Sequence, residues 1–194
     1  MNLVDRVKNI LLAPNKEWPV IAAESHTVAG LYTQYVMILA AIPAICSFIG
    51  FSIIGYSGFG PTYRIPMAAG VANMILSYAL TLGSVYVIAL VIDGLAPKFG
   101  GDKNFMQALK VAAFFPTAAW VAGIFAILPA LAILAVLGSL YSLYLLYTGL
   151  APLMKVPEDK SIAYTAVVVL VAIVLMVVIS AVAALAMPAR TRGF

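Results

Sequence analysis

The sequence has few of the residues that build catalytic or metal sites, and few that keep a surface in water. Its 194 residues include one cysteine and one histidine, and only 9% are charged, against about 25% in an ordinary soluble domain. Cys46 alone forms no internal disulfide, and His26 alone forms no histidine cluster for zinc. The sequence therefore predicts no catalytic set, no metal site and no cofactor.

Apolar residues are what the chain has in excess. They make up 64% of the sequence, more than a single core of this size can cover, and a disordered chain has the opposite composition. The formal net charge of +4 comes from cations that lie mostly between long neutral runs. We therefore predict contact with lipid headgroups and no nucleic-acid partner. The predicted fold class is an all-α polytopic membrane protein.

Four runs carry no charged residue: 25–63, 65–92, 111–154 and 161–189. A helix of about 20 residues crosses the hydrocarbon core of a bilayer. The third run has 44 residues and must turn, because one helix of that length would reach about 66 Å. Pro129 is the expected break. We predict five transmembrane helices, at about 30–54, 67–92, 111–128, 131–150 and 163–187.

The loops between these helices predict the orientation. A cytoplasmic N-terminus places eight cationic residues in the cytoplasm and three on the opposite side, together with the C-terminus, which agrees with the positive-inside rule. The cytoplasmic set is Arg6, Lys8, Lys16, Lys98, Lys103, Lys110, Lys155 and Lys160, and the opposite set is Arg64, Arg190 and Arg192. We expect a cytoplasmic interfacial segment at 1–24 and the membrane domain at 25–194.

The interfacial segment begins with an amphipathic pattern. Its apolar residues recur at helical spacing, with Asn2, Asp5, Arg6 and Asn9 on the other side. This pattern predicts a short helix on the cytoplasmic membrane surface, ended by Pro14. Trp18 is expected to anchor a second segment at the headgroup level, and His26 to be interfacial. The segment either docks a partner or simply anchors the chain to the membrane.

The loop after the second predicted span has two notable features. Gly100 and Gly101 permit positive φ and a sharp reversal, and Asp102 or Asn104 can cap a helix that begins near Phe105. No Lys-Ser/Thr pair follows the glycines, which excludes a nucleotide-binding loop of Walker type. Gln107 and Lys110 are expected at the surface, before this helix enters the membrane.

Asp93 is the acidic residue closest to a span interior. Such residues often mark ion or proton pathways. The alternative is a helix-end residue that faces interfacial water and Lys98. Among uncharged polar residues, Asn73, Ser77 and Ser84 share a face of the second span with Gly70. That face serves either close helix packing or a transport path.

Tyr141, Tyr144 and Tyr147 follow one another at three-residue intervals on the fourth predicted span. Buried tyrosine hydroxyls need hydrogen-bond partners. The three residues either line a polar groove or form an interfacial belt. Pro43 and Pro116 fall in or near spans and are expected to kink them.

Several blocks of the sequence resemble the bacterial branch of the Yip1 domain family. They are Leu95–Gly101 with Gln107–Lys110, Ala119–Phe125, Leu140–Leu150 and Pro152–Pro157. The resemblance extends over nearly the whole chain from Ile10. It implies a cytoplasmic N-terminus, five membrane helices and a bacterial inner-membrane location. Eukaryotic relatives associate with Rab GTPases and with one another. Those relatives carry a long cytoplasmic N-terminal region that is not seen in this sequence.

The function predicted is that of a non-enzymatic membrane protein that organises the membrane or scaffolds partners. The alternative is a small transporter, channel or lipid-moving protein. The expected partners are the lipid bilayer and either a second copy of the chain or other membrane proteins. The candidate functional or partner-contact residues are Asp93, Phe99, Gly100, Gly101, Asn73, Ser77, Tyr141, Tyr144 and Tyr147.

Overall fold

A computed structural model describes residues 2–55, 63–128 and 131–186, and the described chain is built from helices joined by short connections. The expected break at Pro129 and the C-terminal Arg190 and Arg192 lie outside the described residues. Helices satisfy their backbone hydrogen bonds internally, as a chain in hydrocarbon requires. The all-α class predicted from composition is confirmed.

The chain begins with two short helices, α1 (Leu3–Leu12) and α2 (Pro14–Ala23). The Asn2 side chain caps α1 by accepting the Asp5 N–H at 2.8 Å. Pro14 takes the first position of α2, where its missing N–H costs no hydrogen bond. The predicted first helix and its end before Pro14 are both confirmed. We call α1 and α2 together the N-terminal hairpin.

The first long apolar rod runs from Val28 to Ile54 without interruption. It consists of α3 (Val28–Leu31), the π-helical η1 (Tyr32–Val36), α4 (Met37–Phe48) and the π-helical η2 (Ile49–Ile54). The Thr27 side chain caps its start by accepting the Gly30 N–H. Two wide turns of this kind are uncommon within helices and often lie beside functional positions.

The next two rods are joined by a tight turn. The first is α5 (Met67–Leu95), which continues into the 3₁₀ turn η3 (Ala96–Phe99). The second comprises α6 (Phe105–Phe114), α7 (Thr117–Ala122) and the 3₁₀ segment η4 (Gly123–Ile127). The Asn104 side chain caps α6 by accepting the Gln107 N–H, as predicted, and the α-helix breaks at Pro116.

Two long helices complete the bundle, α8 (Ala132–Met154) and α9 (Glu158–Ala186). The long neutral run does reverse, since η4 ends at Ile127, α8 begins at Ala132, and α7 packs against α8. Lys155 ends α8 with a positive φ of 52°. This left-handed residue stops the helix and lets α9 start three residues later.

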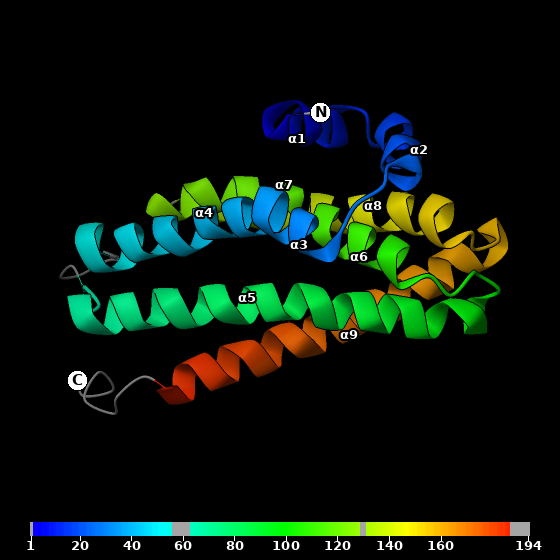
Figure 1. Ribbon diagram of the computed structural model, residues 1–194. Helices are drawn as coiled ribbons and strands as arrows, with labels where there is room; N and C mark the ends of the chain where they lie inside the picture. Colours follow the sequence, from blue (N-terminus) through cyan, green and yellow to red (C-terminus); the bar gives the residue numbers. More distant parts are fainter. Residues whose placement is uncertain (1, 56–62, 129–130, 187–194) are drawn as a thin grey trace.

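Figure 1 shows the long helices side by side, with the N-terminal hairpin lying along α7 and α8 rather than across the end of the bundle. The rod of α6 and α7 is central, because 61% of its most apolar stretch is buried, against 17% for α5. Much of the surface of α5 is therefore left for lipid, and α9 also exposes apolar side chains such as Leu170.

Within the part of the chain that the structure describes, four helical rods are long and apolar enough to cross a membrane: Val28–Ile54, Met67–Phe99, Phe105–Ile127 and Ile133–Met154. They correspond to the first four predicted spans, and they make this an all-α polytopic membrane protein. α9 is one continuous helix of 29 residues. Its role as a fifth crossing stays a prediction.

Candidate functional site

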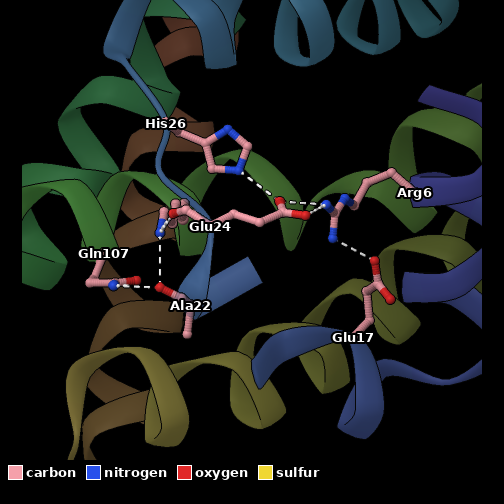
Figure 2. Close-up of polar contacts among 7 residues, drawn as sticks. Arg6, Glu17, Ala22, Glu24, His26 and Gln107 are labelled. Atoms are coloured by element: carbon pink, nitrogen blue, oxygen red, sulfur yellow. Dashed lines mark hydrogen bonds and ion pairs between the residues drawn. The ribbon is translucent and has the colours of Figure 1, made fainter. Parts of the chain in front are cut away.

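Charged residues from both halves of the N-terminal hairpin meet beneath it. The Arg6 guanidinium on α1 donates through Nη1 to Glu17 Oε1 at 2.5 Å and through Nη2 to both carboxylate oxygens of Glu24. Figure 2 shows Arg6 reaching between the two carboxylates. Arg6 and Glu17 are each 5% exposed. Two-sided pairing of this kind offsets the cost of burying the charges.

The bundle joins this cluster through α6. Lys110 Nζ donates to the backbone carbonyls of Ala22, at 3.1 Å, and Glu24, at 2.6 Å. Gln107 Nε2 donates to the same Ala22 carbonyl at 3.0 Å. These bonds satisfy the carbonyls at the end of α2, where a cation is also favoured by the helix dipole. We call Arg6, Glu17, Glu24, His26, Gln107 and Lys110 the hairpin network.

Glu24 is the part of the network best placed to respond to pH. Its partial burial alone would raise the pKa of the carboxyl, but the Arg6 guanidinium and the His26 ring outweigh burial and hold that pKa below its ordinary value. His26 Nε2 lies 3.0 Å from Glu24 Oε2. The network therefore favours the ionised form of Glu24.

Aromatic side chains of α6 and η1 close the network from the bundle side. The Arg6 guanidinium carbon lies 5.8 Å from the centre of the Phe114 ring, and the Tyr35 ring centre is 4.4 Å from the same ring. Tyr35 Oη lies 2.7 Å from Thr117 Oγ1. A pocket of 390 Å³ adjoins the network between α1 and the start of the first rod. Its charged lining residues already belong to the network.

The structure corrects three predictions for this region. Arg6 was expected on the solvent side of α1, but it shares the protein-facing side with Ile10, four residues away. Trp18 is fully buried and donates from Nε1 to Thr148 Oγ1 at 3.1 Å, so it anchors α2 to α8 rather than to headgroups. Lys110 is 2% exposed rather than at the surface, because it neutralises the end of α2.

The structure separates the nine predicted site residues into three places. The first is where the end of α5 meets the α8–α9 connection. Phe99 stacks on Tyr164, with ring centres 5.0 Å apart, and Gly100 adopts a φ of 78°, the reversal that was predicted. Gly101 permits close approach, since an added Cβ would lie 2.6 Å from the Met154 carbonyl oxygen.

Asp93 belongs to this first place and is 8% exposed. Its Oδ1 has no hydrogen-bond partner among the described residues. The Tyr164 hydroxyl donates instead to the Ile92 carbonyl at 2.5 Å. The alternative in which Asp93 faces water and Lys98 is not what the structure shows, because Asp93 is buried and, among the described residues, no ion pair joins it to the exposed Lys98.

The second place is the outer face of α8, which carries the three tyrosines. The rings of Tyr141 and Tyr144 have centres 5.5 Å apart, and the Tyr141 hydroxyl donates to the Leu11 carbonyl at 2.7 Å. Tyr144 and Tyr147 are 43% and 41% exposed. Tyr141 thus holds the end of α1, and the other two tyrosines face outward from the bundle.

The third place is a crevice of 320 Å³ between the first rod and α5, to which we refer as the α4–α5 crevice. Asn73 and Ser77 line it as their spacing predicts, together with Gly70 and Thr81, whereas Ser84 does not. The Ser77 hydroxyl donates to the Met74 carbonyl of its own helix at 3.1 Å. The full lining is Ala40, Pro43, Ala44, Ser47, Phe48, Phe51, Ser52, Ile65, Gly70, Asn73, Met74, Ser77 and Thr81.

The sequence reading missed Glu17, Glu24 and Ser52. Glu17 lies within α2 and Glu24 is the extended residue that ends it, so their spacing carries no periodic signal of a shared contact with Arg6. Ser52 gave no signal either, because a lone serine near the end of an apolar run is common. Its environment arises where the first rod packs against α5, which brings Gly70 next to Ser52.

Comparisons with known proteins agree with this architecture. The model of the Yip1 domain matches residues 8–179. The chain is 32% identical over 117 residues to the "Inner membrane protein YohC" of Escherichia coli strain K12, and the same figures hold for its counterpart in strain O6:H1. Each match covers 60% of this chain and 60% of the relative. No solved structure matches the chain. The family match over most of the sequence, joined to the apolar helical rods, shows that this chain belongs to the Yip1 domain family.

Proposed function

We propose that this protein is a non-enzymatic inner-membrane protein that organises the membrane or holds partners through its helix faces and cytoplasmic loops. The hairpin network is the observation that carries the proposal. Its buried charges are paired with one another or with backbone carbonyls, so they serve to dock a surface helix on the bundle. Charged groups used in this way have a structural role. Contacts with lipid or partner proteins are then left to the outer faces of the helices.

The long outer faces support contact with other membrane components. Ile75 on α5 is 60% exposed and Leu170 on α9 is 62% exposed. The two helices pack together and lie on the side of the bundle away from the hairpin (Figure 1). In a bilayer such faces contact lipid or another helix, because both are apolar.

Site-directed crosslinking tests the proposal. A photoreactive residue at Ile75 or Leu170 should give adducts with a second copy of the chain or with another membrane protein. The matched control places the same residue at Leu145, which is fully buried. If protein adducts were absent from both exposed positions in native membranes, the scaffolding function would be rejected.

We further propose a cytoplasmic N-terminus, five crossings and an opposite C-terminus. The cation distribution supports this orientation, and so does the reversal between η4 and α8. Reporter tags at residues 129 and 155 should then lie on opposite sides of the membrane. Tags on the same side would overturn the proposed topology.

A second candidate function, a small transporter or lipid-moving protein, is favoured by the α4–α5 crevice, which brings Asn73 and Ser77 together inside a span. Lipid scrambling or solute flux in liposomes that is lost on Asn73→Leu would support it. Tyr141→Phe is a control, since Tyr141 bonds to Leu11 and does not line the crevice. Absence of flux over a broad solute panel would reject this candidate.

A further inference from the structure

The α4–α5 crevice contains polar groups that the described protein leaves unused. Ser52 is 6% exposed, and its Oγ has no hydrogen-bond partner among the described residues although it lines the crevice. Asn73 lines the same space, and its side-chain amide has no hydrogen-bond partner among the described residues. An unpaired hydroxyl at this depth is costly. A ligand that accepts hydrogen bonds would remove that cost.

The walls of the crevice define what such a ligand can be. The lining has no charged side chain, and it includes Phe48, Phe51 and Met74. A group that enters must therefore be uncharged, because a buried ion without a partner is strongly disfavoured. The chemistry that fits is an apolar chain carrying a neutral acceptor such as an ester carbonyl.

The volume of the crevice favours a slender occupant. At 320 Å³ it suits one flexible chain better than a packed helix, which is about 10 Å wide. A flexible chain can enter this space, and a volume near 300 Å³ is at the lower end of ordinary ligand sites.

A single cation marks one end of the crevice. Arg64 is the only charged residue between Glu24 and Asp93 in the sequence. Its Nε donates to the Ile54 carbonyl at 3.3 Å. The next residue, Ile65, lines the crevice, and its N–H donates to the Phe51 carbonyl at 3.0 Å. The exposed Arg64 guanidinium is thus pinned where η2 ends, at the level expected for headgroups.

We propose that the α4–α5 crevice is a binding site for one glycerophospholipid. Its phosphate pairs with Arg64, an ester carbonyl accepts hydrogen bonds from Ser52 Oγ and the Asn73 amide, and an acyl chain lies along Phe48 and Met74. Ester groups lie just below the phosphate in a bilayer. That order matches the order of Arg64, Ser52 and Asn73 from the end of the rod inward.

Photolabelling of the full-length protein in liposomes tests the site. The probe is phosphatidylglycerol with a diazirine in one acyl chain, and labelled positions are mapped by mass spectrometry. We expect labelling on both α4 and α5 at crevice residues. Ser52→Ala should reduce this labelling about two- to tenfold, as loss of one hydrogen bond predicts, and Asn73→Leu should act in the same direction. Ser139→Ala, on the exposed face of α8, should have no effect.

Two further arms separate the parts of the proposal. Arg64→Gln should reduce crevice labelling by the phosphatidylglycerol probe and make unlabelled diacylglycerol a relatively stronger competitor, because the probe loses its phosphate contact whereas diacylglycerol has no phosphate. Ala44→Leu should fill the crevice and abolish labelling there, and an unchanged thermal unfolding midpoint would show that the variant is folded. Labelling spread evenly over the outer faces, or crevice labelling unaffected by Ser52→Ala and Asn73→Leu together, would overturn the proposal.

Discussion

The hairpin network and the α4–α5 crevice both place polar groups inside an apolar molecule, but they treat those groups in opposite ways. In the network, Arg6 meets two carboxylates and Lys110 meets two carbonyls, so its cations are paired, although Gln107 Oε1 has no described partner. In the crevice, Ser52 Oγ is buried without a described partner. Paired groups hold the hairpin in place, whereas unpaired groups are available to a ligand. Removing a side chain should therefore have opposite consequences at the two places.

The largest effect is expected for Arg6→Met. This change leaves the Glu17 carboxylate buried at 5% exposure without its cation, a situation that costs about 3–5 kcal/mol. The free energy of unfolding, measured by denaturant titration in micelles, should fall by about that amount. Lys8→Met, at an exposed position of α1, is the matched control, and equal effects of the two changes would contradict the network as described.

Lys110→Met should have the next largest effect. It removes the donor to the Glu24 carbonyl and one of two donors to the Ala22 carbonyl. Leaving such groups unpaired costs about 1–3 kcal/mol. The same titration measures the loss. Lys103→Met, at an exposed position before α6, should be neutral, and a neutral Lys110→Met would show that the lysine does not hold the hairpin.

Tyr141→Phe tests the second attachment of the hairpin. It deletes the hydroxyl that donates to the Leu11 carbonyl at 2.7 Å, which predicts a loss of about 0.5–1.5 kcal/mol in unfolding free energy. Tyr147→Phe is the matched control, because Tyr147 is 41% exposed on the same helix. An equal loss in both variants would mean that the bond to Leu11 contributes nothing.

The pH dependence of the network has a definite sign. The pKa of Glu24 is below its ordinary value of 4.5 in the folded protein, because the Arg6 guanidinium and the His26 ring outweigh its partial burial. Its contribution is therefore fully present above that value and is lost as pH falls through the lower, folded-state pKa. Partial exposure limits this contribution to under about 1 kcal/mol. The stability difference between the native chain and Glu24→Gln should shrink on acidification in thermal unfolding, and a difference that grows would contradict the pairing with Arg6.

The smallest effect is expected in the crevice. Ser52→Ala removes a buried hydroxyl that has no described partner, so unfolding free energy in micelles should stay the same or rise by up to about 1 kcal/mol. Ser142→Ala is the contrasting control. Ser142 is 4% exposed and its Oγ accepts the Ala119 N–H at 2.9 Å, so its loss should destabilise. Equal destabilisation by both changes would remove the distinction between the two regions.

Much of the fold could be predicted from local patterns. The charge-free runs locate the rods, Pro14 and Asn104 mark helix ends, and Gly100 marks a reversal, as the structure confirms. These signals act over a few residues, and capping or backbone φ does not depend on distant partners. The grouping of Asn73 with Ser77 was also predictable, because positions four apart share a face of one helix.

The candidate site was predictable only in part. Trp18, Arg6 and Lys110 were assigned to the surface because residues of their types usually lie there. Burial of Arg6 requires carboxylates 11 and 18 residues away, and burial of Trp18 requires Gly149, whose lack of a side chain leaves room for the indole. Pairings over such separations leave no periodic trace in the sequence.

The amino-acid sequence by itself determined that this chain inserts into a bilayer and roughly where its helical rods begin and end. The reason is that apolar length and charge spacing act on each segment alone. The tertiary structure decided that the N-terminal hairpin lies on α7 and α8, which cations are buried, and where two rods pack so that Ser52 and Asn73 line one crevice. Those outcomes depend on which faces meet across the bundle, since the energy of a buried polar group is set by neighbours that the local sequence does not specify.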